Sequence, residues 1–341
     1  MTICLSIIEN ILNISKYKIY IVCDKKQNDF ARIYLSEFKG RILYKDIVTD
    51  IGFMNKENSL EIDIVLLQKY LDEFVSSWEY VVNDECEFLK TLNVKCIVSD
   101  ISPIGCIVGN KLNLSTIFIS NFSWVEQYKY LGLDDKIVNK FKEAYSYTNK
   151  FIKYDLCLAT DSIHVNETYE VGFICRNIDK SRVYDIQEKY GKSIFITCGK
   201  SANLQRIKVK NFIGTIFITS GVEIVCDSEC DIVELPINIL DTQNYIVASD
   251  VVISKAGWST IAEGILGHSN LVLIEIPSSR EDSFNIEKIK ERKLCISITE
   301  IDLTNIDIEE IKEQLKINID YRKLNSYKND VKKVIDFILN H

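Results

Sequence analysis

The sequence predicts an α/β protein built from two Rossmann-like, doubly wound domains, and three observations lead to this prediction. Short, almost unbroken apolar runs of strand length alternate with longer segments of helical periodicity, which is typical of strands joined by crossover helices. The chain has 341 residues, of which 47% are hydrophobic and 26% charged, enough for two domains with sizeable cores. A polar segment at Asp161–Val171 separates two series of predicted strands. We therefore expect two domains facing each other across a cleft.

The first domain is predicted to span residues 1–162. Ile, Val, Phe and Cys fill its strand-like runs with little alternation, as strands covered on both faces require. The expected strands are Lys18–Cys23, Arg41–Tyr44, Lys95–Ser99, Ser115–Ser120 and Asp155–Ala159, with helical periodicity at Val65–Asn93 and Leu133–Lys150.

The chain is expected to open on a helix, because apolar residues recur at helical spacing within Met1–Leu12. A doubly wound domain normally opens on a buried strand followed by a glycine-rich turn. This domain is therefore predicted to lack its first strand. A misassigned or truncated start and a true loss of the element are both open explanations.

The second domain is predicted to span residues 163–320, followed by an amphipathic C-terminal helix within 321–341. Its expected strands are Ser193–Cys198, Thr215–Thr219, Asp231–Leu235, Val251–Ser254, Leu271–Ile276 and Cys295–Ile298. Its expected helices are Gln243–Ala248, Thr260–Leu266 and Phe284–Arg292.

The net charge and the cysteine pattern indicate which binding partners and which cellular compartment to expect. The net charge of −8 argues against a nucleic-acid-binding surface, although backbone amides can still hold a nucleotide. Eleven scattered cysteines, no C-x-x-C and three histidines indicate reduced, buried thiols rather than a zinc cluster. No run of about 20 apolar residues and no signal peptide is evident. We expect a cytoplasmic protein with no transmembrane segment, no metal and no cofactor.

The strongest candidate for a binding site is the segment Val251–Glu263. A buried strand ends at Ser254, a small-residue turn follows, and a helix is expected to begin near Trp258 or Ser259. Amides of the first helical turn and the positive end of the helix dipole favour an anion there, and Gly257 permits its close approach. The alternative is an ordinary strand–turn–helix with a glycine for tight packing.

This segment, together with Leu271–Pro277 and Arg280–Asn285, resembles the C-terminal donor-binding domain of GT-B glycosyltransferases. The closest resemblance is to family 28, which includes the N-acetylglucosaminyl transferase of peptidoglycan synthesis. The resemblance implies that the donor diphosphate is bound by Ala256, Gly257, Trp258 and Ser259, and that Glu263 binds the ribose.

The same resemblance assigns three further parts of the donor site. Ile239, in the segment Ile237–Asp241, matches the position that reads the base through its backbone, and Glu281 and Asp282 match positions that contact the transferred sugar. Gly199, Lys200 and Ser201 stand where relatives have a Gly-Gly-Ser phosphate loop, with lysine as a departure from that pattern.

In the first half, Asp100 is predicted to follow a buried strand, in the run Val-Ser-Asp-x-x-Pro. With Asn-Phe-Ser-Trp at 121–124, this run resembles a subgroup of predicted glycosyltransferases and a module of plant arabinose kinases. The resemblance implies that Asp100 orients a histidine acting as general base. None of the three histidines matches that position, and a helix N-cap or turn residue is the alternative for Asp100.

Together these features predict an inverting GT-B glycosyltransferase with a nucleotide-sugar donor, most readily a UDP-sugar. No Asp-x-Asp tripeptide occurs, so the helix after Gly257 is expected to stabilise the leaving diphosphate without a metal. The alternatives are a nucleotide-sugar hydrolase or 2-epimerase, and a catalytically silent nucleotide-sugar-binding subunit. The acceptor, whether glycan, lipid-linked or small molecule, is not predicted.

Overall fold

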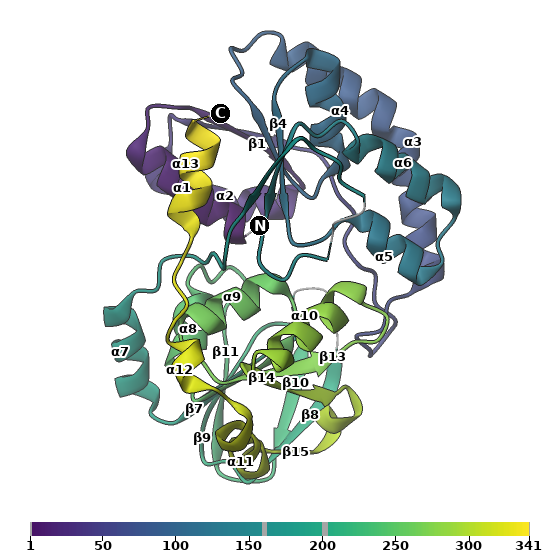
Figure 1. Ribbon diagram of the computed structural model, residues 1–341. Coiled ribbons are helices and arrows are strands. Elements are labelled where there is room, and N and C mark those ends of the chain that lie inside the picture. Colours follow the sequence, from purple (N-terminus) through teal and green to yellow (C-terminus); the bar gives the residue numbers. More distant parts are fainter. Residues whose placement is uncertain (1, 159–161, 200–203, 341) are drawn as a thin grey trace. The chain divides into compact units, whose positions relative to one another are not determined.

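The computed structural model describes residues 2–158, 162–199 and 204–340 (Figure 1). The chain divides into two compact α/β units. The first comprises Met1–Phe53, Asp63–Phe173 and Asp330–His341, and the second comprises Met54–Ile62 and Ile174–Asn329. The boundary lies after Phe173 and not at the expected 162/163, because strand β6 (Glu167–Glu170) pairs with a strand of the first unit.

The first unit alternates helices and parallel strands, and Asp or Ser caps most of its helices, as at α2 (Asp24) and α3 (Asp63). Its strands are β1 (Ile19–Cys23), β2 (Ile42–Asp46), β3 (Ile97–Asp100), β4 (Thr116–Ser120), β5 (Lys150–Lys153) and β6. Its helices are α1 (Thr2–Ile14), α2 (Lys25–Tyr34), α3 (Ile64–Leu89), α4 (Pro103–Leu112), α5 (Trp124–Leu131), α6 (Asp135–Tyr145) and α13 (Val331–Leu339), with a 3-10 turn at Ser36–Phe38.

The expected strand at Asp155–Ala159 is wrong, and the strand lies earlier, at β5. Leu156 has a φ of 57°, so the apolar run that suggested a strand is a turn, and Ala159 lies outside the described residues. Lys150 and Lys153 of β5 pair with Glu167 and Glu170 of β6. These charged residues interrupt the apolar pattern of β5 and of the edge strand β6, so the sequence did not predict either strand.

The strands of the first unit form two separate parallel sheets, β1-β2 and β3-β4-β5-β6. A doubly wound sheet has the strand order 3-2-1-4-5-6. If strand 1 is removed from the middle, strands 3 and 2 remain as a pair and strands 4 to 6 remain as a separate sheet. The observed sheets have this arrangement. The described chain opens on α1, as expected. β3 lies at the edge of its sheet, and its Val98 is 40% exposed.

The expected C-terminal helix is two helices, α12 (Tyr321–Leu324) and α13, which belong to different units. The chain returns to the first unit at Asp330, whose amide donates to the carbonyl of Phe173 at 3.0 Å. The side chain of Asp330 accepts from the amide of Gly172 at 2.8 Å. α13 then packs against α1 (Figure 1). Phe337 of α13 stacks on Tyr169 of β6.

The second unit is organised around a six-stranded parallel sheet in the order β11-β9-β7-β12-β13-β14. These strands are β7 (Ser193–Thr197), β9 (Gly214–Ile218), β11 (Cys230–Glu234), β12 (Val251–Lys255), β13 (Leu271–Glu275) and β14 (Cys295–Thr299). The helices are α7 (Lys180–Tyr190), α8 (Thr242–Ala248), α9 (Trp258–Leu266), α10 (Arg280–Glu291), α11 (Ile308–Asn318) and α12, with a 3-10 turn at Ile301–Asn305. All six predicted strands of this domain are confirmed, with ends that differ by at most one residue.

A second, three-stranded sheet in this unit was not predicted. It has the order β10-β8-β15, formed by β8 (Leu204–Lys210), β10 (Val222–Cys226) and β15 (Ile306–Asp307). A disulfide joins Cys226 and Cys230, contrary to the expectation of reduced thiols throughout, while the other nine cysteines are free.

A short segment from the first half of the chain, Met54–Ile62, belongs to the second unit. Leu60 is 2% exposed and lies in the hydrophobic core of that unit. Glu300 accepts hydrogen bonds from the Ser59 hydroxyl and the Leu60 amide, and the Ile62 amide donates to the Ser278 hydroxyl. We call residues 54–62 the strap.

Among the described helices, none combines the length and apolar character that crossing a membrane requires.

Candidate functional site

The N-terminus of α9 is the centre of the predicted donor site. Gly257 is the N-cap of this helix, with φ −63° and ψ 132°, and no side chain of the described residues caps it. A Cβ added at Gly257 would have its nearest neighbour, Cε of Lys255, at 3.9 Å, an ordinary van der Waals distance. The first turn of α9 therefore presents its positive end to a region without a side-chain cap.

The start of α10 supports the loop between β12 and α9. The side-chain amide of Asn285 donates to the carbonyl of Ala256 at 2.9 Å, and Asn285 is fully buried. Ser279 caps α10 by accepting from the amide of Asp282. The predicted residue Asp282 is buried, which raises the pKa of its carboxyl, and the nearby Lys255 ammonium acts in the opposite direction. The structure thus buries Asp282 in the first turn of α10, near the Lys255 ammonium.

Lys255 lies between two of the predicted phosphate loops, the one at Gly199 and the one at Gly257. Gly199, with φ 82°, ends the stretch after β7, and a Cβ added there would lie 2.8 Å from Cε of Lys255. The lysine side chain therefore runs directly across Gly199. Lys200 and Ser201, the other predicted residues of this loop, lie outside the described residues. Lys255 was not among the predicted site residues, although it stands in the run that led to the prediction.

Glu263, the predicted ribose ligand, is engaged by a buried arginine. Its Oε1 accepts from Nε of Arg176 at 2.9 Å and lies 2.8 Å from Nη2 of the same side chain. Glu263 is 4% exposed and Arg176 is 1% exposed. The carboxylate is therefore held in one position within the second unit, and both contacts with Arg176 use the same oxygen.

Arg176 also holds the segment predicted to cover the base. Its Nη1 donates to the carbonyl of Leu240 at 2.6 Å, and its Nη2 donates to the Thr242 hydroxyl at 2.8 Å. Ile239 itself lies in a turn, where its amide donates to the carbonyl of Pro236 at 2.9 Å. One side chain thus connects the predicted base segment to the predicted ribose ligand. Arg176 belongs to no recognisable motif, so the sequence offered no signal for it.

The remaining predicted donor residues lie around the same helix ends. Trp258 is buried, whereas Ser259 and Thr260 are half-buried in the first turn of α9. The Thr260 amide donates to the carbonyl of Gly257 at 3.1 Å. Glu281 is half-buried in the first turn of α10.

In the first unit, Asp100 ends β3 and does not cap the following helix. The N-cap of α4 is Ser102, whose hydroxyl accepts from the amide of Ile104. The thiol of Cys4, in the first turn of α1, donates to Oδ2 of Asp100 at 2.7 Å. Burial and the Asp100 carboxylate raise the pKa of Cys4 well above its usual value. A protonated thiol therefore occupies the place beside Asp100 where the resemblance implies a histidine.

A second carboxyl, Asp50, lies close to Asp100 and was not predicted from the sequence. Burial raises the pKa of Asp50 to about 7, and the negative charge of Asp100 adds to the rise. The Trp124 indole opposes it by favouring the charged form. Asp50 comes four residues after β2 in a run without a recognisable motif, so only the folded chain places it beside Asp100.

The two described histidines, His164 and His268, are exposed and lie outside these clusters. In the part of the chain that the structure describes, no group of three or more His, Cys, Asp or Glu residues could hold a metal ion.

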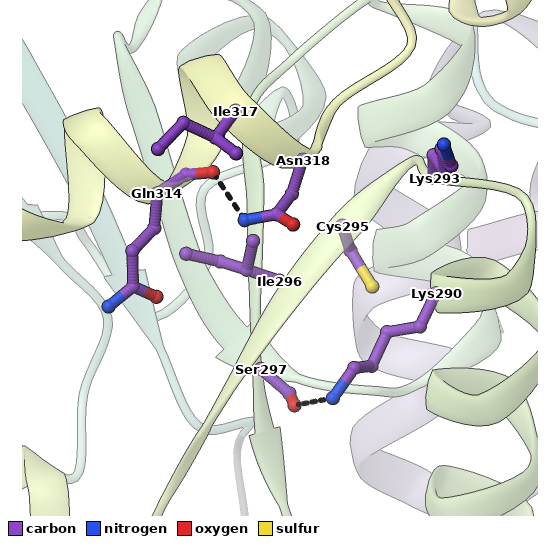
Figure 2. A pocket seen from close by; sticks show the side chains of 8 residues that line it. All are labelled: Lys290, Lys293, Cys295, Ile296, Ser297, Gln314, Ile317 and Asn318. Atoms are coloured by element: carbon purple, nitrogen blue, oxygen red, sulfur yellow. Dashed lines mark hydrogen bonds between the residues drawn. The ribbon is translucent and has the colours of Figure 1, made fainter.

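A cavity of about 370 Å³ lies elsewhere in the second unit, beside the first residues of β14 (Figure 2). Its walls come from α10, β14 and α11, and Lys290 within it donates to the Ser297 hydroxyl at 2.9 Å. The predicted donor residues instead follow the carboxyl ends of β7 and β12. None of the predicted site residues lines this cavity.

Comparison with known proteins gives one similar curated sequence. No protein-family model matches the chain. L-arabinokinase of Arabidopsis thaliana is 23% identical over 273 residues, which cover 75% of this chain and 25% of the relative. The chain thus spans about a quarter of that relative's length. This match agrees with the resemblance to plant arabinose kinases seen in the first half of the sequence.

Solved structures of similar fold cover nearly the whole chain. UGT89C1 of Arabidopsis thaliana in complex with quercetin is 10% identical with a TM-score of 0.65, covering 99% of this chain and 95% of that chain. UGT2 of Phytolacca americana, complexed with UDP-2-fluoro-glucose and pterostilbene, is 9% identical with a TM-score of 0.61, covering 99% and 96%. MurG of Acinetobacter baumannii is 11% identical with a TM-score of 0.53, covering 99% and 95%.

These likenesses show the fold. The chain has the α/β architecture with parallel sheets of GT-B glycosyltransferases, as expected. Both plant UGTs and MurG match it, so the finer resemblance to family 28 stays a prediction.

Proposed function

We propose that the protein is an inverting glycosyltransferase that uses a nucleotide-sugar, most readily a UDP-sugar, and needs no metal. The observation that carries the proposal is the uncapped N-terminus of α9, with Lys255 on one side and Glu263 one helical turn further along. Proteins of similar fold are described in complex with UDP, UDP-L-rhamnose and UDP-2-fluoro-glucose. Nine free cysteines fit a reducing, cytoplasmic setting, which we include in the proposal, and the Cys226–Cys230 disulfide is the exception to it.

The chemistry follows from the charge that develops during transfer. An acceptor hydroxyl attacks the anomeric carbon, the bond from that carbon to the phosphate oxygen breaks, and its electron pair leaves with the diphosphate. The first-turn amides of α9 and the Lys255 ammonium would stabilise this negative charge. Glu263, held by Arg176, would accept hydrogen bonds from the two ribose hydroxyls.

Calorimetric titration with UDP tests the donor site. Glu263→Gln should weaken UDP binding by about 5- to 100-fold, equivalent to roughly 1–3 kcal/mol for a lost charged hydrogen bond. Lys255→Ala should weaken it by a similar factor. Lys290→Ala is the matched control, because this lysine lies at the separate cavity of Figure 2 and should leave the affinity unchanged. Failure of the wild type to bind UDP, or equal affinity in all variants, would contradict the proposal.

A catalytically silent nucleotide-sugar-binding module is a second candidate, favoured by the Cys4 thiol beside Asp100. Incubation of the protein with UDP-glucose or UDP-L-rhamnose, with and without candidate acceptors, separates the possibilities. A hydrolase or 2-epimerase converts the donor alone, a transferase needs an acceptor for fast turnover, and a silent module binds without turnover.

A further inference from the structure

The strap is a short hairpin that belongs to the second unit, although the chain on both sides of it belongs to the first. Asn55 and Ile62 pair in an antiparallel bridge, and the amide of Lys56 donates to the carbonyl of Glu61 at 2.8 Å. An isolated two-stranded hairpin is at best marginally stable in water. The contacts between the strap and the rest of the second unit must therefore hold it in place.

Glu300, which follows β14, anchors the strap near its turn. Its Oε2 accepts from the Ser59 hydroxyl at 3.2 Å and from the Leu60 amide at 3.1 Å. The Leu60 side chain packs in the same hydrophobic core as Cys198, which directly follows β7. Burial raises the pKa of Cys198 to about 12, the Lys255 ammonium opposes the rise, and the Glu300 carboxylate adds to it. The anchor of the strap and the lysine of the proposed donor site therefore both lie near this buried thiol.

The end of the strap is bound to the loop that leads into α10. The Ile62 amide donates to the Ser278 hydroxyl at 3.0 Å. Ser278 stands directly before Ser279, the N-cap of α10, whose hydroxyl accepts from the Asp282 amide at 3.2 Å. The Ser279 amide donates in turn to the carbonyl of Ile276 at 2.9 Å. The strap thus holds the residue next to the cap from which α10 starts.

A second contact ties the beginning of α10 to the loop before α9. The buried Asn285 donates to the carbonyl of Ala256 at 2.9 Å. The first turn of α10 carries Glu281 and Asp282, for which the sequence predicts contacts with the transferred sugar. Groups that recognise a ligand must be held to within about 0.5 Å, and residues around them provide that precision. The strap and Asn285 are the supports that the structure gives to this turn.

We propose that the strap sets the sugar specificity of the donor site by fixing the first turn of α10, and with it the contacts to the hydroxyl groups of the transferred sugar. This inference rests on the proposed glycosyltransferase function and deepens it, because it names the part of the chain that selects the sugar. Glu300 and Ser278 are positioning residues, since they bind the strap and act on the sugar through α10. All the residues involved belong to the second unit.

This role predicts a difference between UDP and a UDP-sugar. In the proposed site the diphosphate is bound at the start of α9 and by Lys255, whereas only the sugar reaches the first turn of α10. A strap that loses its anchor lets α10 shift, so the sugar contacts weaken while those to the diphosphate remain. A strap that serves only the stability of the second unit would instead change the affinities for UDP and for UDP-sugars by the same factor.

The experiment titrates UDP, UDP-glucose and UDP-L-rhamnose into the wild-type chain and its variants by calorimetry. Glu300→Ala should weaken binding of the preferred UDP-sugar by about 5- to 10-fold, the equivalent of one or two hydrogen bonds, and leave UDP affinity unchanged. The preference between the two sugars should also shrink. Glu300→Gln should keep the wild-type affinities, because its amide oxygen can still accept from the Leu60 amide.

Asp307→Ala is the matched control. Asp307 also accepts hydrogen bonds from two backbone amides of the second unit, as the N-cap of α11. Its loss should cost a similar amount of stability and change none of the three affinities. Ser278→Ala is a milder second variant that removes the partner of the Ile62 amide, and it should act in the same direction as Glu300→Ala. Amide hydrogen exchange at Asp282 should be faster in both strap variants than in the control.

The outcomes separate this inference from the proposed function. If the wild type binds no UDP, the proposed function fails and the role of the strap falls with it. If UDP binds but Glu300→Ala and Ser278→Ala bind both UDP-sugars as the wild type does, only the strap's role is refuted. The same holds if these variants lose affinity for UDP and for the UDP-sugars by an equal factor. A wild type that binds UDP and neither UDP-sugar also overturns the inference.

Discussion

Arg176 is the residue on which the arrangement of the donor site depends. Its guanidinium contacts Glu263, the carbonyl of Leu240 and the Thr242 hydroxyl, and it is almost completely buried. A buried charge left without its partner is strongly unfavourable. The pair therefore fixes the carboxylate in one position and ties the segment before α8 to α9.

Arg176→Met tests this role. The change leaves Glu263 buried without its partner, so it should lower the free energy of unfolding by roughly 3–5 kcal/mol. The matched control is Arg182→Met, because Arg182 pairs with Asp241 at an exposed site where an ion pair contributes about 0–1 kcal/mol. Denaturation in urea, followed by tryptophan fluorescence, measures both. An equal decrease in the free energy of unfolding of both variants would show that the buried ion pair contributes no more to stability than the exposed one.

At the scale of elements, the division of the first unit's sheet has a measurable consequence. β1 pairs on one side with β2, and β3 pairs on one side with β4, whereas β4 pairs on both sides. Backbone amides on an unpaired edge open to solvent more readily than those held on both sides. We expect amide hydrogen exchange in β1 and β3 to be faster than in β4 and β12. Uniform protection across these four strands would mean that another segment pairs with the two edges.

The strap provides a second prediction at this scale. Leu60→Ala removes a side chain that is 2% exposed in the core of the second unit, so it should cost about 2–5 kcal/mol in stability. Val65→Ala is the control, because Val65 is 82% exposed at the start of α3. Thermal unfolding compares the two variants. If Leu60→Ala unfolds at the wild-type temperature, the strap is not part of that core.

The central strands could be predicted from the sequence because they are buried on both faces and therefore continuously apolar. β4, β7, β12 and β13 are of this kind, and their residues are nearly all inaccessible to solvent. β5 and the edge strand β6 carry charged residues that pair across the sheet, so periodicity did not identify them. The sheet of β8, β10 and β15 was not predicted for a related reason. β10 alternates buried and exposed positions, and β15 lies far from the other two strands in the sequence.

For the whole molecule, local motifs predicted parts of the candidate site that lie on one strand–turn–helix. Ala256, Gly257 and Glu263 belong to one such unit, and the fold places them as the spacing suggested. Arg176 and Asp50 depend on contacts between residues that are distant in sequence, 87 positions apart for Arg176 and Glu263. No pattern along the chain can encode such a pair, since only folding brings the two together.

The need for a metal is a property of the whole enzyme, because the negative charge of the leaving diphosphate must be stabilised somewhere. The chain carries a net charge of −8, so general attraction to a phosphate group is not available and local groups must provide it. In the proposed site these groups are Lys255 and the uncapped end of α9. We therefore expect UDP affinity and UDP release to stay within about twofold when a chelator is added, and to fall about tenfold or more in Lys255→Ala. A loss of activity with chelator that magnesium restores would place the stabilising charge on a metal ion and contradict this role for Lys255.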